Sequence, residues 1–527
     1  MVHPGYRKRT IFLLVALLLV RFWFGQTFEL SGHEAYLWLQ GHGTNLSMAY
    51  WERGPVVPGL IRIGTAFFGD TELGVRWLAA VICCTSGFIL FYLARHWFSA
   101  RCAFWTVVLF IVIPMYAWRL SFMTEATVSI GLMAVTLLAF SMAVERDKIG
   151  WWLLGGAACG LALLVALPNI WWMAGLLLYF VIAPSRRQRL REPQLWITMI
   201  FINLFLLPII WWWRGPQVAD VARTRILNAW PLSHSFSLHQ GFSFFWKEIF
   251  YLSPLFFILL VVLLWRLGRQ LWEDPRYGLL VCLAFPGLIW ENFSAFFQEG
   301  RPDLIPAFFL PLILLVGCYT ARVTPIGRST RWMYGIIFAL ALLQSLAGLN
   351  PFYITSKADG SGYQIHRTQS GETTFYADKR QISWRNLADG IQSLQRDAGV
   401  GATLIITDTP ETASALSFYL PRNPFVYVAS KPDVITHFDF WPHYDESASP
   451  NDSALFINRS TDPRREADPP PADIIKNFTT VTKMDDPSLP DFNRSWDIWN
   501  CQKFIASGQS TGTPQANPMP EPEALPK

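Results

Sequence analysis

Residues Ile11–Phe28, IFLLVALLLVRFWFGQTF, form an apolar run whose single charge is Arg21. The run is long enough to cross the ~30 Å hydrocarbon core of a bilayer as a helix. Arg21 lies near the outer end, where its long side chain can reach the membrane interface. A secretory signal peptide has similar composition, but no small-residue cleavage site follows Phe24. We therefore expect a retained first membrane helix.

Similar apolar runs recur through the first two-thirds of the chain. Residues are 52% hydrophobic and only 15% charged, against about 25% charged in soluble domains. Tryptophans gather at the ends of the runs, as in the aromatic belts of membrane proteins. These features exclude the buried helices of a soluble protein and predict about eleven spans. The expected spans are 11–28, 77–94, 102–118, 126–144, 151–167, 170–183, 195–213, 245–265, 277–293, 304–320 and 332–349.

Basic residues predict the orientation in the membrane. They are concentrated in alternate loops, which the positive-inside rule places in the cytoplasm together with the N-terminus. An odd number of spans then sends the C-terminal region to the periplasmic side of an inner (plasma) membrane. The net charge of +5 comes mostly from these loops and requires no nucleic-acid partner, whereas the lipid bilayer is an obligatory one. The loop residues are Arg7, Lys8, Arg9, Arg95, Arg101, Arg146, Lys148, Arg186, Arg187, Arg189, Arg191, Arg266, Arg269, Arg276, Arg322, Arg328 and Arg331.

Composition divides the chain into three regions. Residues 1–350 form the membrane part, with long outward loops at 29–73 and 214–244. Residues 351–505 lack long apolar runs and predict a small periplasmic α/β domain. Residues 506–527 are rich in Gly, Ser, Thr, Pro and Glu and are expected to be disordered. The predicted fold class is a mostly α, polytopic transmembrane helix bundle with a small C-terminal α/β domain outside the membrane.

Local patterns place elements in the C-terminal region. Ser383 can cap a helix that runs to about Arg396, with Leu387, Ile391 and Leu394 on one face. A second helix is expected over 411–420, and buried strands over 403–407, 425–429 and 454–457. Strands that alternate with helices predict a short, partly parallel sheet.

The first outward loop is rich in ionisable residues directly after a membrane helix. His33 and Glu34 offer a general base at the membrane surface. Glu52 and Arg53 precede Gly-Pro, which places a cation on a constrained turn suited to an anionic headgroup. Loops of this length also carry such charges as ordinary solvated surface, so these residues by themselves leave both interpretations open.

The order of short motifs resembles the C-type membrane glycosyltransferases. The nearest groups are the protein O-mannosyltransferases (glycosyltransferase family 39) and the bacterial enzymes that add aminoarabinose to lipid A. The motifs in the loop are His33-Glu34-Ala35-Tyr36, Tyr50-Trp51-Glu52-Arg53-Gly54-Pro55, Phe67-Phe68-Gly69-Asp70-Thr71-Glu72 and Arg76. Weaker matches follow at Trp118-Arg119, Thr124-Glu125-Ala126, Gly156–Leu164, Ser414–Leu420 and Phe438–Trp441.

This resemblance implies a reaction in which a sugar passes from a polyprenyl-phosphate carrier to an acceptor at the periplasmic face, with inversion at the anomeric carbon. A carboxylate or imidazole would deprotonate the acceptor, and cations would stabilise the leaving phosphate. The catalytic candidates are Glu34, His33 and Glu125. The candidates for binding the lipid phosphate or donor are Arg53, Glu52, Arg119, Arg301 and Arg76.

Three polar positions depart from the family pattern. His33 replaces the first acid, Glu125 replaces an Asp, and Ala166 ends a motif that usually ends in Lys. An imidazole can deprotonate a hydroxyl, so an active enzyme remains one interpretation. A catalytically inactive subunit that binds a lipid-linked sugar is the second, and a lipid or solute transporter is the third.

No metal or nucleotide motif is visible in the sequence. There is no Cys/His constellation with metal-ligand spacing and no phosphate-cradling glycine loop. We therefore assign no cofactor, with the lipid-linked sugar as donor substrate, and leave open a divalent metal held by carboxylates. Neither the sugar nor the acceptor (lipid A, a glycan or a protein) follows from the residues.

Overall fold

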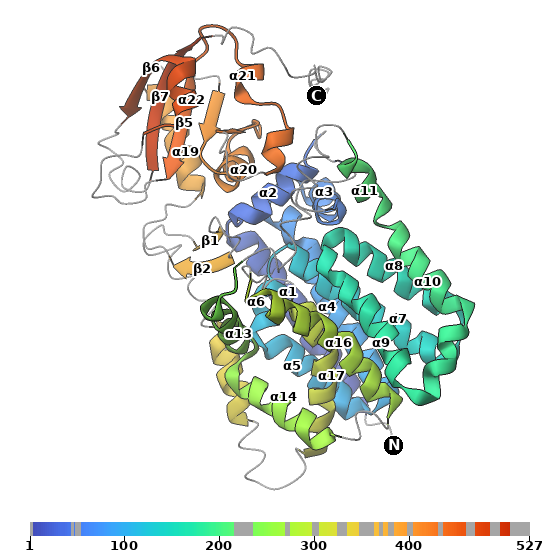
Figure 1. Ribbon diagram of the computed structural model, residues 1–527. Coiled ribbons are helices and arrows are strands. Elements are labelled where there is room, and N and C mark those ends of the chain that lie inside the picture. Colours follow the sequence, from blue (N-terminus) through green and yellow to red (C-terminus); the bar gives the residue numbers. More distant parts are fainter. Residues whose placement is uncertain are drawn as a thin grey trace.

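The computed structural model shows a helical bundle with an α/β unit at one end (Figure 1). It describes residues 4–43, 47, 54–215, 235–268, 274–297, 305–323, 335–346, 363–367, 373–377, 384–397, 404–429, 436–459, 469–484 and 496–505. The N-terminus lies at the end of the bundle far from the α/β unit (Figure 1). The predicted fold class is confirmed by this architecture.

Most of the described chain before residue 350 is helical. The helices are α1 (Pro4–Thr27), α2 (Gly32–Gly41), α3 (Val56–Phe68), α4 (Glu72–Trp97), α5 (Ala100–Val112), α6 (Pro114–Arg119), α7 (Glu125–Arg146), α8 (Ile149–Val165), α9 (Ile170–Ile182), α10 (Pro193–Leu204), α11 (Leu207–Trp213), α13 (Leu238–Leu252), α14 (Pro254–Leu267), α16 (Pro275–Ser294) and α17 (Ile305–Val323). Short 3₁₀ turns at Leu167–Asn169 and Pro184–Arg191 flank α9.

Within the described residues, four helices are long and apolar enough to cross a membrane: Gly5–Thr27, Glu72–Trp97, Glu125–Arg146 and Pro193–Trp213. A fifth span results if α13 and α14 are counted together, although they are bent by 96° at their junction. Shorter apolar helices include Val56–Phe68, Ala100–Val112, Ile149–Val165, Leu167–Ile182, Ile305–Ala321 and Gly335–Leu346. The count of about eleven spans therefore stays a prediction.

Two segments differ from the sequence-based expectation. The run 102–118 breaks where α5 ends, because Pro114 begins the separate short helix α6. Proline has no N–H to donate and clashes with the preceding turn, so it starts a helix more readily than it continues one. The segment 29–73, predicted to be a long outward loop, contains helices α2 and α3.

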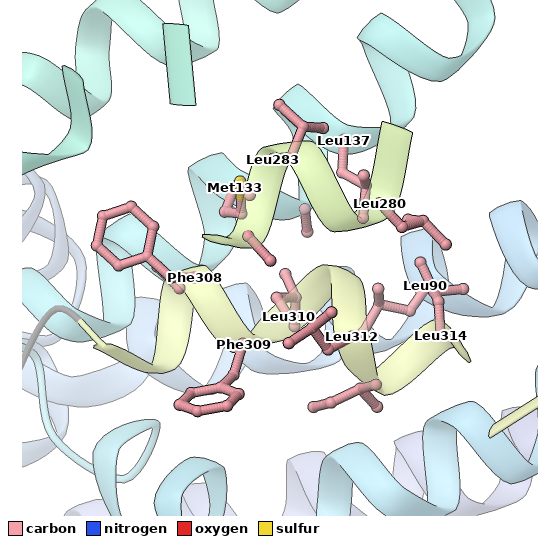
Figure 2. Packing of buried hydrophobic residues seen from close by; sticks show 14 of the residues in the cluster. Leu90, Met133, Leu137, Leu280, Leu283, Phe308, Phe309, Leu310, Leu312 and Leu314 are labelled. Carbon is pink, nitrogen blue, oxygen red and sulfur yellow. The ribbon is translucent and has the colours of Figure 1, made fainter. Parts of the chain in front are cut away.

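The bundle core takes buried side chains from many helices, among them leucine, phenylalanine and methionine residues of α4, α7, α16 and α17. Figure 2 shows α16 and α17 contributing most of them, packed against residues of α4 and α7. Leu280, Leu283 and Phe308 are fully buried, as is Met133 of α7. This packing holds in place the helices of the bundle, including those that carry polar residues at the end nearer the α/β unit.

The C-terminal unit is built on a five-stranded sheet in the order β4-β3-β5-β7-β6. Strand β3 pairs in parallel with β4 and β5, whereas β7 pairs antiparallel with β5 and β6. The partly parallel sheet is thus confirmed, and its two antiparallel strands were not anticipated. The sheet strands are β3 (Leu404–Thr407), β4 (Tyr427–Val428), β5 (Ala454–Arg459), β6 (Phe478–Met484) and β7 (Trp496–Phe504). The remaining elements are the hairpin β1 (Tyr363–Arg367) and β2 (Thr373–Ala377), and helices α19 (Trp384–Asp397), α20 (Pro410–Tyr419), α21 (Tyr444–Ser447) and α22 (Ala472–Asn477).

The predicted helices of this unit are confirmed as α19 and α20. Leu387 and Ile391 of α19 are fully buried on one face, as the periodicity indicated. The proposed boundaries at 350 and 505 stay predictions, and the tail 506–527 lies outside the described residues.

The C-terminal unit docks on helix α2 through α20 (Figure 1). A Cβ on Gly32 would lie 2.7 Å from the Cβ of Glu411, so only glycine permits this approach. Trp38 meets the ring of Phe418 edge to face, with centroids 4.9 Å apart. The Tyr36 hydroxyl accepts a hydrogen bond of 3.1 Å from the His437 amide. The unit therefore holds the helix that carries His33 and Glu34.

His437 predicts a pH dependence of stability. Burial between Trp212 and Trp441 lowers its pKa from 6.5 to about 3. Between these values the unfolded chain binds a proton that the folded chain does not. The free energy of unfolding should therefore fall by up to about 1.4 kcal/mol for each pH unit as the pH drops below 6.5.

Thermal unfolding of the detergent-solubilised full chain between pH 7.5 and 5 measures this slope. His437→Phe keeps an aromatic ring at the site and should flatten it, whereas His443→Phe in the same unit should not. An unchanged slope in His437→Phe would contradict the assignment.

Candidate functional site

Helix α2 begins with a capping box that orients its first turn. The Ser31 hydroxyl accepts from the Glu34 amide at 3.2 Å, and Glu34 Oε2 accepts from the Ser31 amide at 3.1 Å. Reciprocal capping satisfies two backbone donors and fixes where the helix starts. His33 and Glu34 are therefore held in a defined first turn.

Glu34 forms a buried, bidentate ion pair with Arg76 of α4. Arg76 donates from Nε to Oε1 at 2.8 Å and from Nη2 to Oε2 at 2.6 Å. The Met123 amide also donates to Oε1, at 3.0 Å. The remaining guanidinium hydrogen bonds go to the carbonyls of Phe28 and Glu29, at 2.7 and 2.8 Å. The pair ties together the end of α1, α2, α4 and the segment before α7.

This geometry argues against two roles expected from the sequence. Glu34 is fully buried and accepts from five donors, so its oxygens are committed to the fold. Arg76 is 2% exposed and pairs with Glu34, which leaves its charge balanced within the protein. A general base must reach the proton that it abstracts, and a phosphate ligand must reach the lipid. The pair instead has the properties of a structural ion pair.

His33 and Glu125 meet although they lie far apart in the sequence. His33 Nε2 is 3.1 Å from Glu125 Oε2, at the start of α7. The imidazole side chain is 22% exposed and the carboxylate 6%, so the histidine side of the pair is the more accessible. A carboxylate beside an imidazole orients its tautomer and stabilises its protonated form. The arrangement can therefore remove a proton from a hydroxyl group.

A second polar layer lies one helical turn below Glu125. Asn169 donates to the Ser129 hydroxyl at 3.1 Å and to the Ala162 carbonyl at 2.8 Å, and both polar side chains are fully buried. This pair was not predicted from the sequence. Its only signal was one amide within the apolar stretch Leu167–Ile182.

Three predicted phosphate or donor ligands, Glu52, Arg53 and Arg301, lie outside the described residues. The neighbouring Gly54 donates its amide to the Leu164 carbonyl at 2.9 Å. A Cβ on Gly54 would lie 2.2 Å from that oxygen, so the close approach requires glycine. The segment that follows Arg53 is thus attached to the end of α8.

Arg119 ends α6, is half-buried, and lines a small cavity with Glu248. Among the described residues, no group of three or more His, Cys, Asp or Glu side chains is placed to hold a metal ion. Of the eight predicted site residues, the structure brings together His33 with Glu125 and Glu34 with Arg76.

Comparisons with known proteins support the resemblance. The family model described as dolichyl-phosphate-mannose-protein mannosyltransferase matches residues 52–212. Lipid A galacturonosyltransferase RgtD from Rhizobium johnstonii is 24% identical over 263 residues, which are 50% of this chain and 54% of RgtD. The chain thus spans about half the length of the curated relative that it matches.

Solved structures extend the similarity over almost the whole chain. ArnT from Cupriavidus metallidurans superposes with a TM-score of 0.61 in the apo state, at 15% identity, covering 96% of this chain and 99% of ArnT. The same protein bound to undecaprenyl phosphate gives 0.62 at 14% identity, with the same coverage. The resemblance to C-type membrane glycosyltransferases, and the fold that it implied, are confirmed.

Proposed function

We propose that this chain is a membrane glycosyltransferase that moves a sugar from a polyprenyl-phosphate donor to an acceptor at the periplasmic face of the inner membrane. The observation that carries the proposal is the contact of 3.1 Å between His33 and Glu125. Both residues were candidates from sequence, and they meet on the side of the bundle that bears the C-terminal unit. The similarity to RgtD, named as a lipid A galacturonosyltransferase, supports an envelope lipid or glycan as acceptor.

In the proposed reaction, the His33 imidazole removes the proton of an acceptor hydroxyl. The acceptor oxygen attacks the anomeric carbon, and the bond from that carbon to the phosphate oxygen breaks. Polyprenyl phosphate leaves with the bonding electrons, and the configuration inverts. Glu125 stabilises the imidazolium that forms. The cations proposed to stabilise the departing phosphate are Arg53, Arg119 and Arg301.

The histidine is compatible with this chemistry although the family usually has an acid there. An imidazole titrates near pH 6.5, so its neutral form is available as a base at physiological pH. Glu125 keeps the carboxylate of the family's second acidic motif and lies beside the imidazole. The site therefore retains a base and a carboxylate, placed on α2 and α7.

A transfer assay tests the proposal. Full-length protein in nanodiscs is supplied with radiolabelled undecaprenyl-phosphate sugars and with lipid A, and labelled product is separated by chromatography. Transfer of label supports an enzyme. Donor binding without turnover would replace the proposal with an inactive lipid-sugar binding subunit. Solute uptake by proteoliposomes without sugar transfer would replace it with a transporter.

Arg53→Ala tests the phosphate role. A lost charge-assisted hydrogen bond costs about 1.5–3 kcal/mol, so the KM for donor should rise roughly 10- to 100-fold. Arg95→Ala removes an exposed arginine in the last turn of α4 and should leave the KM for donor unchanged. Equal KM values for the two variants would show that Arg53 does not bind the donor phosphate.

A further inference from the structure

Glu248 is a buried carboxylate that the proposed reaction does not use. It lies on α13 and is 5% exposed. Its Oε2 accepts a hydrogen bond of 2.9 Å from the side-chain amide of Asn292 on α16. Within the described part of the chain, no donor reaches its second oxygen, Oε1, which is also buried. The sequence did not single out Glu248, because it falls near the start of the predicted span 245–265.

A second buried carboxylate, that of Glu291, lies near Glu248. Glu291 precedes Asn292 on α16, is 3% exposed, and is close enough to repel the charge of Glu248. A charged group buried within a membrane protein is costly and usually faces a ligand or a water-filled path. Two carboxylates together disfavour an anionic ligand and favour one that donates hydrogen bonds.

Glu248 also lines a small cavity between α6, α13 and α17. The cavity measures about 10 Å³ and is lined by Met115, Trp118, Arg119, Glu248, Tyr251 and Ile305. Such a volume holds about one water-sized group, so it suits one hydroxyl or ammonium rather than a whole sugar ring. Arg119, a candidate phosphate ligand, lines the same cavity. A lipid-linked sugar carries its hydroxyls within a few bonds of its phosphate.

We propose that Glu248 accepts a hydrogen bond from a hydroxyl or ammonium group of the sugar, and that this site selects neutral or amino sugars over uronic acids. The inference rests on the proposed function and specifies its donor. RgtD, by its name, transfers galacturonic acid, so the two proteins are expected to differ in donor. The same chemistry would suit a hydroxyl of the acceptor, and binding measured without acceptor separates the two sources.

The test measures binding of four probes to full-length protein in nanodiscs without acceptor. The probes are undecaprenyl phosphate alone and its conjugates with glucose, 4-amino-4-deoxyarabinose and galacturonic acid. Wild type should bind the glucose or the amino-sugar conjugate at least tenfold more tightly than the galacturonic acid conjugate. Glu248→Gln, which is nearly isosteric, should reduce that ratio to about threefold or less while keeping the affinity for undecaprenyl phosphate.

Asn292→Ala is the matched control, because it breaks the link between α13 and α16 but keeps the carboxylate. It should retain most of the discrimination between sugars. If Glu248→Gln does not fold, Glu248→Asp, which withdraws the oxygen by one methylene, should show the same loss of discrimination.

Equal ratios in wild type and Glu248→Gln, or tightest binding of the galacturonic acid conjugate, would overturn the inference and leave the proposed function standing. Loss of discrimination in Asn292→Ala equal to that in Glu248→Gln would assign Glu248 a purely structural role. If Glu248→Gln keeps the donor ratios and instead weakens binding of added acceptor, the recognised hydroxyl belongs to the acceptor and the inference is overturned. Failure of wild type to bind any sugar conjugate would overturn the proposed function itself.

Discussion

Replacing His33 with alanine is expected to slow sugar transfer by about 100- to 10,000-fold, the usual contribution of a general base. The imidazole is the more exposed member of the pair with Glu125, so its removal should take away the base without disturbing the bundle core. Initial rates of label transfer at saturating donor, with gel filtration to verify folding, measure the effect. The loss should appear in kcat rather than in the KM for donor.

The Glu125→Gln variant tests whether the contact between His33 and Glu125 is catalytic or merely structural. The amide keeps the size of the side chain but cannot stabilise the imidazolium, so kcat should also fall. Because a carboxylate favours protonated imidazole, its removal should move the acid limb of the pH–rate profile to lower pH. A structural role for the contact would not move that limb.

The matched control is a second His–Glu pair, whose histidine, His96, lies in the last turn of α4. His96 Nε2 lies 2.8 Å from Glu145 Oε2, and both side chains are partly exposed. An exposed pair contributes little to stability, so His96→Ala should leave both folding and transfer nearly unchanged. If the His33→Ala variant transfers sugar at the wild-type rate, another residue must act as the base.

Breaking the pair between Glu34 and Arg76 is expected to destabilise the protein by about 3–5 kcal/mol, because removal of one partner leaves an unpaired buried charge. Both single variants, Glu34→Ala and Arg76→Ala, should therefore lose yield and melt at lower temperature in detergent. A double variant, Glu34→Leu with Arg76→Met, removes both charges and should recover a large part of the loss.

Arg385→Ala provides the reference for an ion pair with one exposed partner. The Arg385 side chain is 52% exposed and that of its partner Glu72 is 11% exposed, so this change should cost less than breaking the fully buried pair of Glu34 and Arg76. A Glu34→Ala variant that melts like wild type but has lost transfer would contradict the structural role of Glu34. That result would return it to the catalytic candidates.

The candidate site shows what kind of prediction a sequence supports. His33, Glu34 and Glu125 were found because residue type and motif order are visible along the chain. Which of them pair was not visible, since the contact between His33 and Glu125 joins positions 92 residues apart. The neighbouring Glu34 was equally plausible as a base by chemistry. Only the five donors around it show that it is committed to the fold.

The sequence by itself determined the helical bundle, the amphipathic helix α19 and the mixed helix–strand character of the C-terminal unit. These features depend on run length and periodicity, which are local properties of the chain. Tertiary structure alone decided the partner of each buried charge, the attachment of α2 to α20 and the position of Glu248 beside Arg119. The physical reason is that burial and pairing depend on which helices pack together, and that choice is made by many weak contacts across the whole bundle.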